Sequence, residues 1–225
     1  MISTIVKKIT GKTISEDISV FYLCQRGLPY LLGRLRGIVR KWTFKGDKKA
    51  LFLGKHTQVL LPKRLYLGHH VRLGNFVYID ASSRDGIHLG NHVKLGDYSK
   101  VIGSGSITHL GKGLEIGENS SFSEYTFFGS AGGIKIGSNV IAGQNVRFHA
   151  ENHNFNDLDV LIREQGVTHK GIIVGDNCWI GAGATFLDGA KVGSGCVVAA
   201  NAVITKEFPD NAIVGGIPAK IIGFR

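Results

Sequence analysis

The stretch from Val174 to Lys206 reads VGDNCW IGAGAT FLDGAK VGSGCV VAANAV ITK when it is divided every six residues. The first position of each block is bulky and apolar, and it is occupied by Val174, Ile180, Phe186, Val192, Val198 and Ile204. The fifth position is small in every complete block, and it is occupied by Cys178, Ala184, Ala190, Cys196 and Ala202. A period of six fits neither the repeat of a helix nor that of a simple strand. We therefore expect coils of three short strands, stacked into a triangular prism.

The position before each small residue indicates where a coil turns. It holds only Gly or Asn, namely Asn177, Gly183, Gly189, Gly195 and Asn201. These two residue types adopt a positive φ at the lowest cost, so we expect them at the corners. The bulky residue then fills the interior, and stacked coils pair as parallel strands roughly 4.8 Å apart.

The same signature, an aliphatic residue followed by Gly, begins near residue 51 with less regular spacing. Its members are Leu53-Gly54, Leu67-Gly68, Leu73-Gly74, Leu89-Gly90, Leu95-Gly96, Ile116-Gly117 and Ile136-Gly137. Insertions interrupt the pattern around residues 85–88, around residues 129–133 and, longest of all, over about 154–173. Long loops in compact domains are usually functional or disordered, so the last insertion predicts a protruding loop with a role in the site.

Residues 1–50 carry most of the positive charge. They hold eleven Lys and Arg against three Asp and Glu, a net charge of +8 out of +10 for the whole chain. We expect a basic helical segment here, followed by the β-helix from residue 51 to 225 with its loop and a C-terminal tail. Two roles are open for this segment. It would either cap the open end of the prism or lie as a basic amphipathic patch on an anionic membrane face. No RNA-binding or DNA-binding motif accompanies the charge, so nucleic acid is not an expected partner.

Two helices are expected within this segment. Thr13 and Glu16 have the spacing of a capping box, and the first helix should end where Gly27 and Pro29 interrupt the pattern. The second helix should begin at Pro29, with apolar residues on one side and arginines beyond them. The apolar residues are Leu31, Leu32, Leu35, Ile38 and Val39, and the arginines are Arg34, Arg36 and Arg40.

The composition favours a cytoplasmic protein. Hydrophobic residues make up 43% of the chain, yet no apolar run reaches the length of a membrane span and no secretory signal is visible. If the basic segment lies on a membrane instead of capping the prism, the protein would be peripheral at the inner membrane face. Cys178 and Cys196 lie one coil apart in the inward column, so we expect buried and reduced thiols.

Three motifs now identify a resemblance. They are Asn152-His153 before the long insertion, Gly175-Asp-Asn-Cys-Trp-Ile-Gly-Ala182 after it, and Gly215-Gly-Ile-Pro-Ala-Lys220 near the end. Residues 51–225 resemble the hexapeptide-repeat acyltransferases, above all the maltose, galactoside and polysaccharide O-acetyltransferases. The resemblance implies an all-β fold, a left-handed parallel β-helix, with acetyl-CoA bound between the subunits of a homotrimer. A trimer would also cover apolar residues such as Phe127-Phe128, which we expect to meet water on a monomer.

Acetyl transfer from a thioester to a sugar hydroxyl needs a base and a group that stabilises an oxyanion, but no metal. Histidine is the natural base at neutral pH, and nine histidines are available. His153 stands where regular coil gives way to loop, and the resemblance assigns the catalytic role to this position. His149 is the alternative base, and His169 is a candidate contact to the substrate from the loop.

The resemblance also implies the residues that bind acetyl-CoA. Gly181, Ala182 and Ala200 would contact the pantetheine arm through the backbone, where small residues let it approach. Thr205 and Lys206 match a Thr-Lys pair near the nucleotide end, and Lys220 would meet the phosphates. Solvated surface charge is the other interpretation of both lysines.

The acceptor side departs from the galactoside enzymes, which carry an asparagine on the coil before the histidine. Ser123 and Glu124 stand there in this chain and are our candidates for contacts to the substrate. We expect an acetyl-CoA-dependent O-acetyltransferase that acts on a sugar hydroxyl of a bacterial surface glycan or its precursor. The alternatives are an N-acetyltransferase of an amino sugar nucleotide, a γ-class carbonic anhydrase that would use His149 and His153, and a purely structural β-helix.

Overall fold

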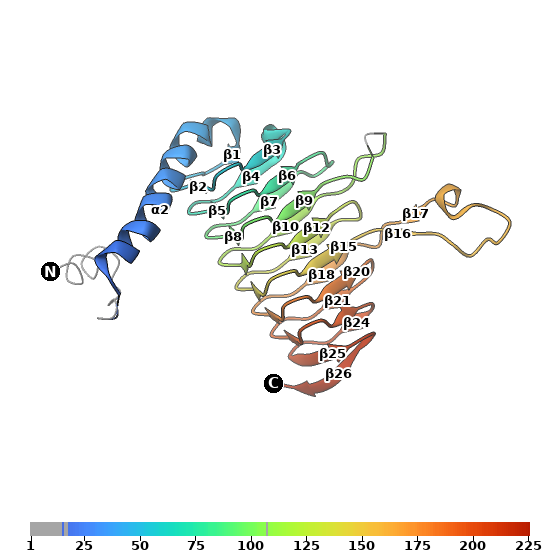
Figure 1. Cartoon of the computed structure of the whole chain (residues 1–225). Coiled ribbons are helices and arrows are strands. Elements are labelled where there is room, and N and C mark those ends of the chain that lie inside the picture. Colours follow the sequence, from blue (N-terminus) through green and yellow to red (C-terminus); the bar gives the residue numbers. More distant parts are fainter. Residues whose placement is uncertain (1–14, 16–17, 107) are drawn as a thin grey trace.

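The computed structural model describes residue 15, residues 18–106 and residues 108–225. From Lys45 onward the chain winds into stacked coils of three short strands, with the C-terminus at the far end of the prism (Figure 1). Strands of successive coils pair in parallel, which produces three sheets along the prism that we call faces A, B and C. This is the expected all-β architecture, a left-handed parallel β-helix.

The strands of each face follow one another along the prism in the order of the chain. Face A consists of β1 (Lys45–Gly46), β4 (Leu65–Leu67), β7 (Ile87–Leu89), β10 (Leu114–Ile116), β13 (Ile134–Ile136), β18 (Ile172–Val174), β21 (Lys191–Val192) and β24 (Glu207–Phe208). Face B consists of β2 (Phe52–Leu53), β5 (Arg72–Leu73), β8 (Lys94–Leu95), β11 (Ser121–Phe122), β14 (Ile141–Ala142), β19 (Trp179–Ile180), β22 (Val197–Val198), β25 (Ala212–Gly216) and the antiparallel β26 (Ala219–Phe224). Face C consists of β3 (Gln58–Leu60), β6 (Tyr78–Asp80), β9 (Lys100–Ile102), β12 (Phe127–Gly129), β15 (Arg147–His149), β20 (Thr185–Leu187) and β23 (Val203–Ile204).

The hexapeptide columns have the positions expected of them. Every bulky residue from Val174 to Ile204 and every small residue from Cys178 to Ala202 is buried. The corner residues adopt a positive φ, for example 54° at Asn177 and 73° at Gly183. Each period of six is therefore confirmed as one side of a three-sided coil.

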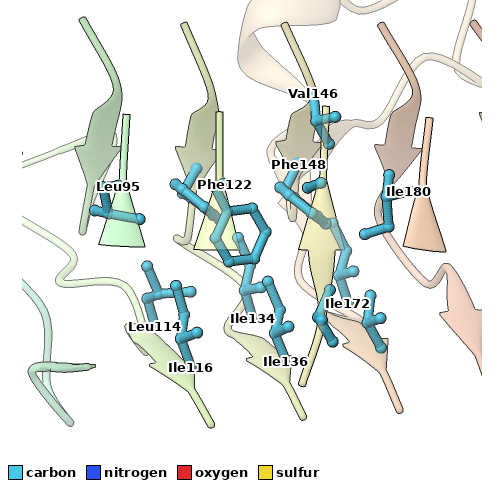
Figure 2. Close-up of a cluster of buried hydrophobic side chains, with 14 of the residues drawn as sticks. Leu95, Leu114, Ile116, Phe122, Ile134, Ile136, Val146, Phe148, Ile172 and Ile180 are labelled. Carbon is cyan, nitrogen blue, oxygen red and sulfur yellow. The ribbon is translucent and has the colours of Figure 1, made fainter. Parts of the chain in front are cut away.

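Aromatic rings fill the middle of the prism. Phe128, Phe148 and Phe186 stack on successive coils of face C, with ring centroids 5.1 and 4.7 Å apart, and Figure 2 shows Phe122 and Phe148 among aliphatic side chains that point inward from the strands. The expectation that Phe127-Phe128 meets water was wrong for Phe128, which is fully buried. Its middle position in β12 explains this, because alternate residues of a strand point to opposite sides.

The large insertions leave the prism at one corner, between face C and face A. The longest forms an arm in which β16 (Asn152–His153) pairs antiparallel with β17 (Val167–Thr168), and the turn of 3-10 helix η3 (Ile162–Glu164) lies beyond them (Figure 1). The predicted protruding loop is this arm. A second insertion between β9 and β10, residues 103–113, was missed by the sequence analysis.

The expected pair of helices is one continuous helix, α2 (Val20–Arg40), followed by the 3-10 turn η1 (Lys41–Thr43). Pro29 lies inside it, so the expected interruption at Gly27 and Pro29 was wrong. The side chain of Ser19 accepts the backbone N–H of Tyr22 at 3.2 Å and caps its N-terminus. The proposed capping box of Thr13 and Glu16 lies outside the described residues.

Gly33, Gly37 and three arginines of α2 face the prism, whereas most of its leucines are exposed. A Cβ atom on Gly37 would lie 2.1 Å from the carbonyl oxygen of Leu51, so only glycine allows this close approach. The guanidinium of Arg36 donates to the carbonyl of Leu53 at 2.8 Å. Arg34 and Arg40 donate in the same way to the carbonyls of Leu51 and Thr57, at 3.0 and 2.8 Å.

These bonds lie on the first coil, at β2 of face B and just before β3 of face C, and each of these strands has a neighbour on one side only. Edge carbonyls left without donors would invite another strand, and the arginines occupy them. The geometry fits the capping role for α2, with its apolar side turned outward. No helix in the described part of the chain combines the length and the hydropathy that a bilayer span requires.

Candidate functional site

A groove lies on face C at the base of the arm. Its floor comes from outward side chains of the strands, including Ile102, Phe127 and His149, and Gly105 of the second insertion closes one side. Glu151 and His153, on the arm, close the other. The volume is about 300 Å³, open to solvent, which is at the lower end of the range for small-molecule pockets and fits a single sugar.

His153 occupies the end of β16, where the arm leaves the prism. It pairs with Val167 of β17, and its side chain is exposed at the groove. A short antiparallel ladder therefore positions the backbone of this residue, although it lies outside the coil. A side chain placed on such a base can meet a substrate that lies along face C.

The arm is fastened to the prism where it returns. Asp188 is buried, and its carboxylate accepts the backbone N–H groups of Lys170 and Gly171 at 2.9 and 2.8 Å. The hydroxyl of Thr168, in β17, lies 3.3 Å from the same carboxylate. Asp188 thus anchors the end of β17 and the residues that follow it. Because β17 pairs with β16, this contact also positions β16, the strand that contains His153.

A second contact crosses the base of the arm. The ring Nε2 of His169 lies 2.7 Å from a carboxylate oxygen of Glu151, with both side chains about one-third exposed. Glu151 also lines the groove. His169, expected to contact the substrate from the loop, is therefore engaged with Glu151 on the approach to His153.

His149 lies on the floor of the groove and is more buried than His153. Its ring centroid is 5.2 Å from that of Phe127. Burial, helped by the positive charge of Arg147, lowers the pKa of His149. The neutral imidazole is therefore favoured at this position.

The acceptor and cofactor candidates lie mainly at the other border of face C. A groove at the corner between faces B and C is lined by Glu124, Ala182, Ala200 and Arg147 among others. Arg147 and His149 project from the same side of β15, two residues apart, which is roughly 7 Å along a strand. One face thus joins the groove that contains Glu124 to the groove that contains His153.

The other predicted residues are distributed along the C-terminal coils. Gly181 precedes Ala182 and stacks on the next coil, where a Cβ atom would lie 2.5 Å from the backbone nitrogen of Ala200. Ser123 is half-buried beside Glu124 at the same corner. Thr205 and Lys206 follow β23 at the corner between faces C and A, two coils beyond β15, and both are exposed.

Lys220 is the outlier of the set. It lies in β26 at the end of face B, paired with Gly215, and it is not among the residues that line either groove. Of the predicted site residues, only His153, Glu124, Ala182 and Ala200 line the two grooves. Ser123, Gly181, Thr205 and Lys206 lie at the borders of face C, and Lys220 lies away from it.

Sequence reasoning missed Asp188 and the Glu151–His169 pair. For Asp188 a signal was present, because the sequence Leu187-Asp188-Gly189 puts a carboxylate between an apolar residue and a corner glycine. The partner of Glu151 lies eighteen residues away across the arm, and no spacing rule connects them. Within the described residues, no three His, Cys, Asp or Glu side chains gather as ligands for a metal ion.

Comparison with known proteins gives the same repeat. Residues 171–206 match the family model described as bacterial transferase hexapeptide, six repeats. Galactoside O-acetyltransferase of Lactococcus lactis is 28% identical over 118 residues, 52% of this chain and 53% of that protein. Galactoside O-acetyltransferase of Escherichia coli is 28% identical over 120 residues, 52% and 54% of the two chains. The chain spans about half the length of the curated relatives that it matches.

Solved structures share the architecture over a longer stretch. AntD, an N-acyltransferase from Bacillus cereus solved with dTDP and 3-hydroxybutyryl-CoA, superposes with a TM-score of 0.57 at 17% identity, over 84% of this chain and 88% of that one. At this identity the likeness shows the fold alone. The repeat, the fold and the curated relatives agree: residues 171–206 carry the bacterial transferase hexapeptide repeat, and about half of the chain is similar to curated acetyltransferases.

Proposed function

We propose that this protein is an acetyl-CoA-dependent O-acetyltransferase whose acceptor is a sugar hydroxyl of a bacterial surface glycan or its precursor. The observation that carries the proposal is the position of His153 at the mouth of a groove on face C. A groove of small residues, including Ala182 and Ala200, borders the same face. A thin acyl-donor arm and a bulkier acceptor can therefore meet on one surface.

The transfer needs one proton acceptor and one donor of the acetyl group. His153 accepts the proton of the sugar hydroxyl while that oxygen forms a bond to the thioester carbonyl carbon. The carbon–sulfur bond of the tetrahedral intermediate then breaks, and the imidazolium returns the proton to the departing CoA thiolate. No residue needs to carry the acetyl group, because no Ser or Cys stands in a nucleophile motif beside His153.

The donor would lie along the C-terminal coils. Gly181, Ala182 and Ala200 leave room for the pantetheine arm at the corner of faces B and C. Thr205 and Lys206 would contact the nucleotide end, and the exposed ammonium of Lys220 would meet a phosphate from the end of face B. A cytoplasmic location belongs to the same proposal, because acyl-CoA donors are cytoplasmic metabolites.

The acceptor would lie along face C, with its reacting hydroxyl at His153 and its far end toward the corner that holds Ser123 and Glu124. A carboxylate such as Glu124 accepts hydrogen bonds from sugar hydroxyls, which makes it a suitable orienting group. The names of the galactoside O-acetyltransferases favour a hydroxyl acceptor. A nucleotide-linked amino sugar is the second candidate, favoured by the AntD structure solved with dTDP-4-amino-4,6-dideoxyglucose and coenzyme A.

A homotrimer is part of the proposal. On the C-terminal half of face B, apolar side chains point outward from neighbouring strands, and Ile141 and Trp179 pair directly and are 54% and 57% exposed. Val197 and Ile213 continue this column on the next strands. A copy packed against face B would bury them. Light scattering that gives a mass near that of a single 24.3 kDa chain at micromolar concentration would contradict the trimer.

The deciding experiment supplies acetyl-CoA with matched pairs of acceptors, each pair differing only in a hydroxyl or an amine at one carbon. Release of free CoA thiol measures turnover, and His153→Ala controls for spontaneous hydrolysis. Turnover with hydroxyl acceptors supports the proposal, and turnover with amines alone supports the second candidate. A protein that binds acetyl-CoA but gives no turnover with any nucleotide-linked, lipid-linked or free sugar would contradict both.

A further inference from the structure

Helix α2 presents an unbroken apolar face to solvent. Six of its outward side chains are 49 to 75% exposed, namely Phe21, Leu28, Leu31, Leu35, Ile38 and Val39. Trp42, in the 3-10 turn η1, continues this face and is 74% exposed. In Figure 1 the helix lies on the outside of the first coils, and no other helix or strand of the described residues is packed over its far side. We call these seven residues the outer face of α2.

The helix cannot bury this face by rotating. Its inner side holds Gly33 and Gly37, whose missing side chains admit the ring of Phe52 and the backbone of Leu51. Turning the apolar residues inward would place large side chains in that space. It would also break the three bonds that Arg34, Arg36 and Arg40 make to backbone carbonyls. The outer face is therefore fixed in its orientation toward solvent.

Positive charge surrounds this face. Residues 20–55 contain nine Lys and Arg and a single carboxylate, Asp47, which is already near Lys49 and His69 at 3.8 and 3.6 Å. At Trp42 the arrangement is local, because the ammonium of Lys41 lies 4.9 Å from its ring centroid. The ammonium of Lys63 donates to the carbonyl of Trp42 at 3.4 Å.

We propose that the outer face of α2 rests on an anionic lipid surface, with its apolar side chains inserted and its lysines at the level of the headgroups. An apolar stripe, an adjoining basic rim and a tryptophan at the border are the features of a helix that lies in the plane of a membrane. Two copies of this face would bring like charges together, whereas an anionic headgroup layer is complementary to them. The proposal is independent of the transfer reaction.

The structure also indicates how electrostatic attraction and apolar insertion would each contribute to membrane binding. Arg34, Arg36 and Arg40 donate to backbone carbonyls of the prism. The attraction to the headgroups therefore comes from the exposed Arg26 and from the lysines Lys41, Lys45, Lys49 and Lys63. Apolar insertion supplies the remainder, and it persists in salt that screens the lysines. This differs from a purely electrostatic patch, in which moderate salt abolishes binding.

The test uses the full chain with vesicles of phosphatidylcholine alone or of equal parts phosphatidylcholine and phosphatidylglycerol. Sedimentation gives the partition coefficient, and emission of Trp42 in a Trp179→Phe background reports insertion. The variant Leu35→Glu/Val39→Glu places two charges on the outer face, where exposed side chains contribute little to folding. Leu158→Glu is the matched control, because Leu158 is 96% exposed on the arm, away from α2.

We expect wild type and Leu158→Glu to bind the anionic vesicles with a blue shift of the Trp42 emission. We expect Leu35→Glu/Val39→Glu to lower the partition coefficient about tenfold or more while it retains the thermal unfolding midpoint. Neutral vesicles should bind more weakly than anionic ones, since each lysine near the surface adds about 1 kcal/mol.

Two outcomes would overturn the proposal. One is equal partitioning of wild type and the double variant, or none for either. The other is a wild type that ignores vesicles but loses an assembled state in light scattering when the double substitution is made. That result would assign the outer face to contacts between copies of this chain.

Discussion

The carboxylate of Asp188 accepts the backbone N–H of Gly171 at 2.8 Å, at the point where the arm rejoins the prism. The same carboxylate holds the N–H of Lys170. The strand that pairs with His153 ends just before these residues, so a buried group of the regular coil fixes the point where the arm ends. We infer that Asp188 positions the proposed base without touching the substrate.

Removing this anchor should loosen the arm. In Asp188→Ala two backbone N–H groups lose their acceptor, which costs roughly 1–3 kcal/mol where water cannot replace it. We expect a lower kcat and faster hydrogen exchange at residues 167–171, with the KM for acetyl-CoA almost unchanged because Ala182 and Ala200 lie at another corner. Asp188→Asn keeps one acceptor oxygen and should recover part of kcat. Unchanged exchange and kcat in Asp188→Ala would contradict this role.

The prism could be predicted from the sequence because its determinants are local. Each coil repeats the same bulky, small and corner positions, and residues such as Ile180 and Ala184 need no partner outside the pattern to specify their burial. The position of His153 beside the arm was predictable for the same reason, since a break in a regular pattern is visible along the chain.

The orientation of α2 and the place of Pro29 inside it could not be predicted, because they depend on contacts between residues far apart in sequence. The apolar pattern of α2 predicted an amphipathic helix, but an amphipathic helix ordinarily buries its apolar side. Only the clearance at Gly37 and the bonds of Arg34, Arg36 and Arg40 show that this one is reversed. Pro29 was misread because a proline removes one helix bond, which the packing of α2 against β2 offsets.

His153→Ala should lower kcat by about 10²- to 10⁴-fold, the usual contribution of a positioned general base. The affinity for CoA should barely change, and the limb of the pH profile of kcat/KM that reports the base should disappear. The matched variant is His169→Ala, which removes a ring of the same size on the same arm. If His153→Ala keeps more than about a tenth of kcat in a folded protein, the assignment is wrong and His149 is the next residue to test.

His149 should make folding sensitive to mild acid. Its pKa is lowered by burial in the folded protein, whereas the unfolded chain has the ordinary value near 6.5. Between the lowered pKa and 6.5 the unfolded state binds more protons, so stability is complete above this window and is lost as the pH falls through it. The drop in Tm from about pH 7.5 to about pH 5.5 should therefore be larger in wild type than in His149→Gln. Equal drops would contradict the effect.

The cysteines should differ in reactivity. Burial raises the pKa of Cys178 to about 11, and it raises that of Cys196 as well, so neither forms much thiolate near neutral pH. Cys24 is exposed on α2. Iodoacetamide should modify Cys24 alone in the native protein and all three thiols after denaturation, as counted by mass spectrometry. Cys24→Ser should then show no native modification, and rapid labelling of Cys196 would contradict the buried column.

Substitution by alanine should destabilise the protein at Gly37 and stabilise it at Gly27, although both glycines lie in α2. Gly37→Ala places a methyl group 2.1 Å from the carbonyl oxygen of Leu51, and because backbone cannot yield, the helix must shift and strain the bond between Arg36 and Leu53. We expect a loss of about 1–3 kcal/mol and faster hydrogen exchange throughout α2. Gly27→Ala is the matched control, because no atom lies within 4 Å of the added carbon and alanine favours a helix interior by about 1 kcal/mol. If the hydrogen-exchange protection of α2 falls in both variants, or in neither, the helix does not dock through Gly37.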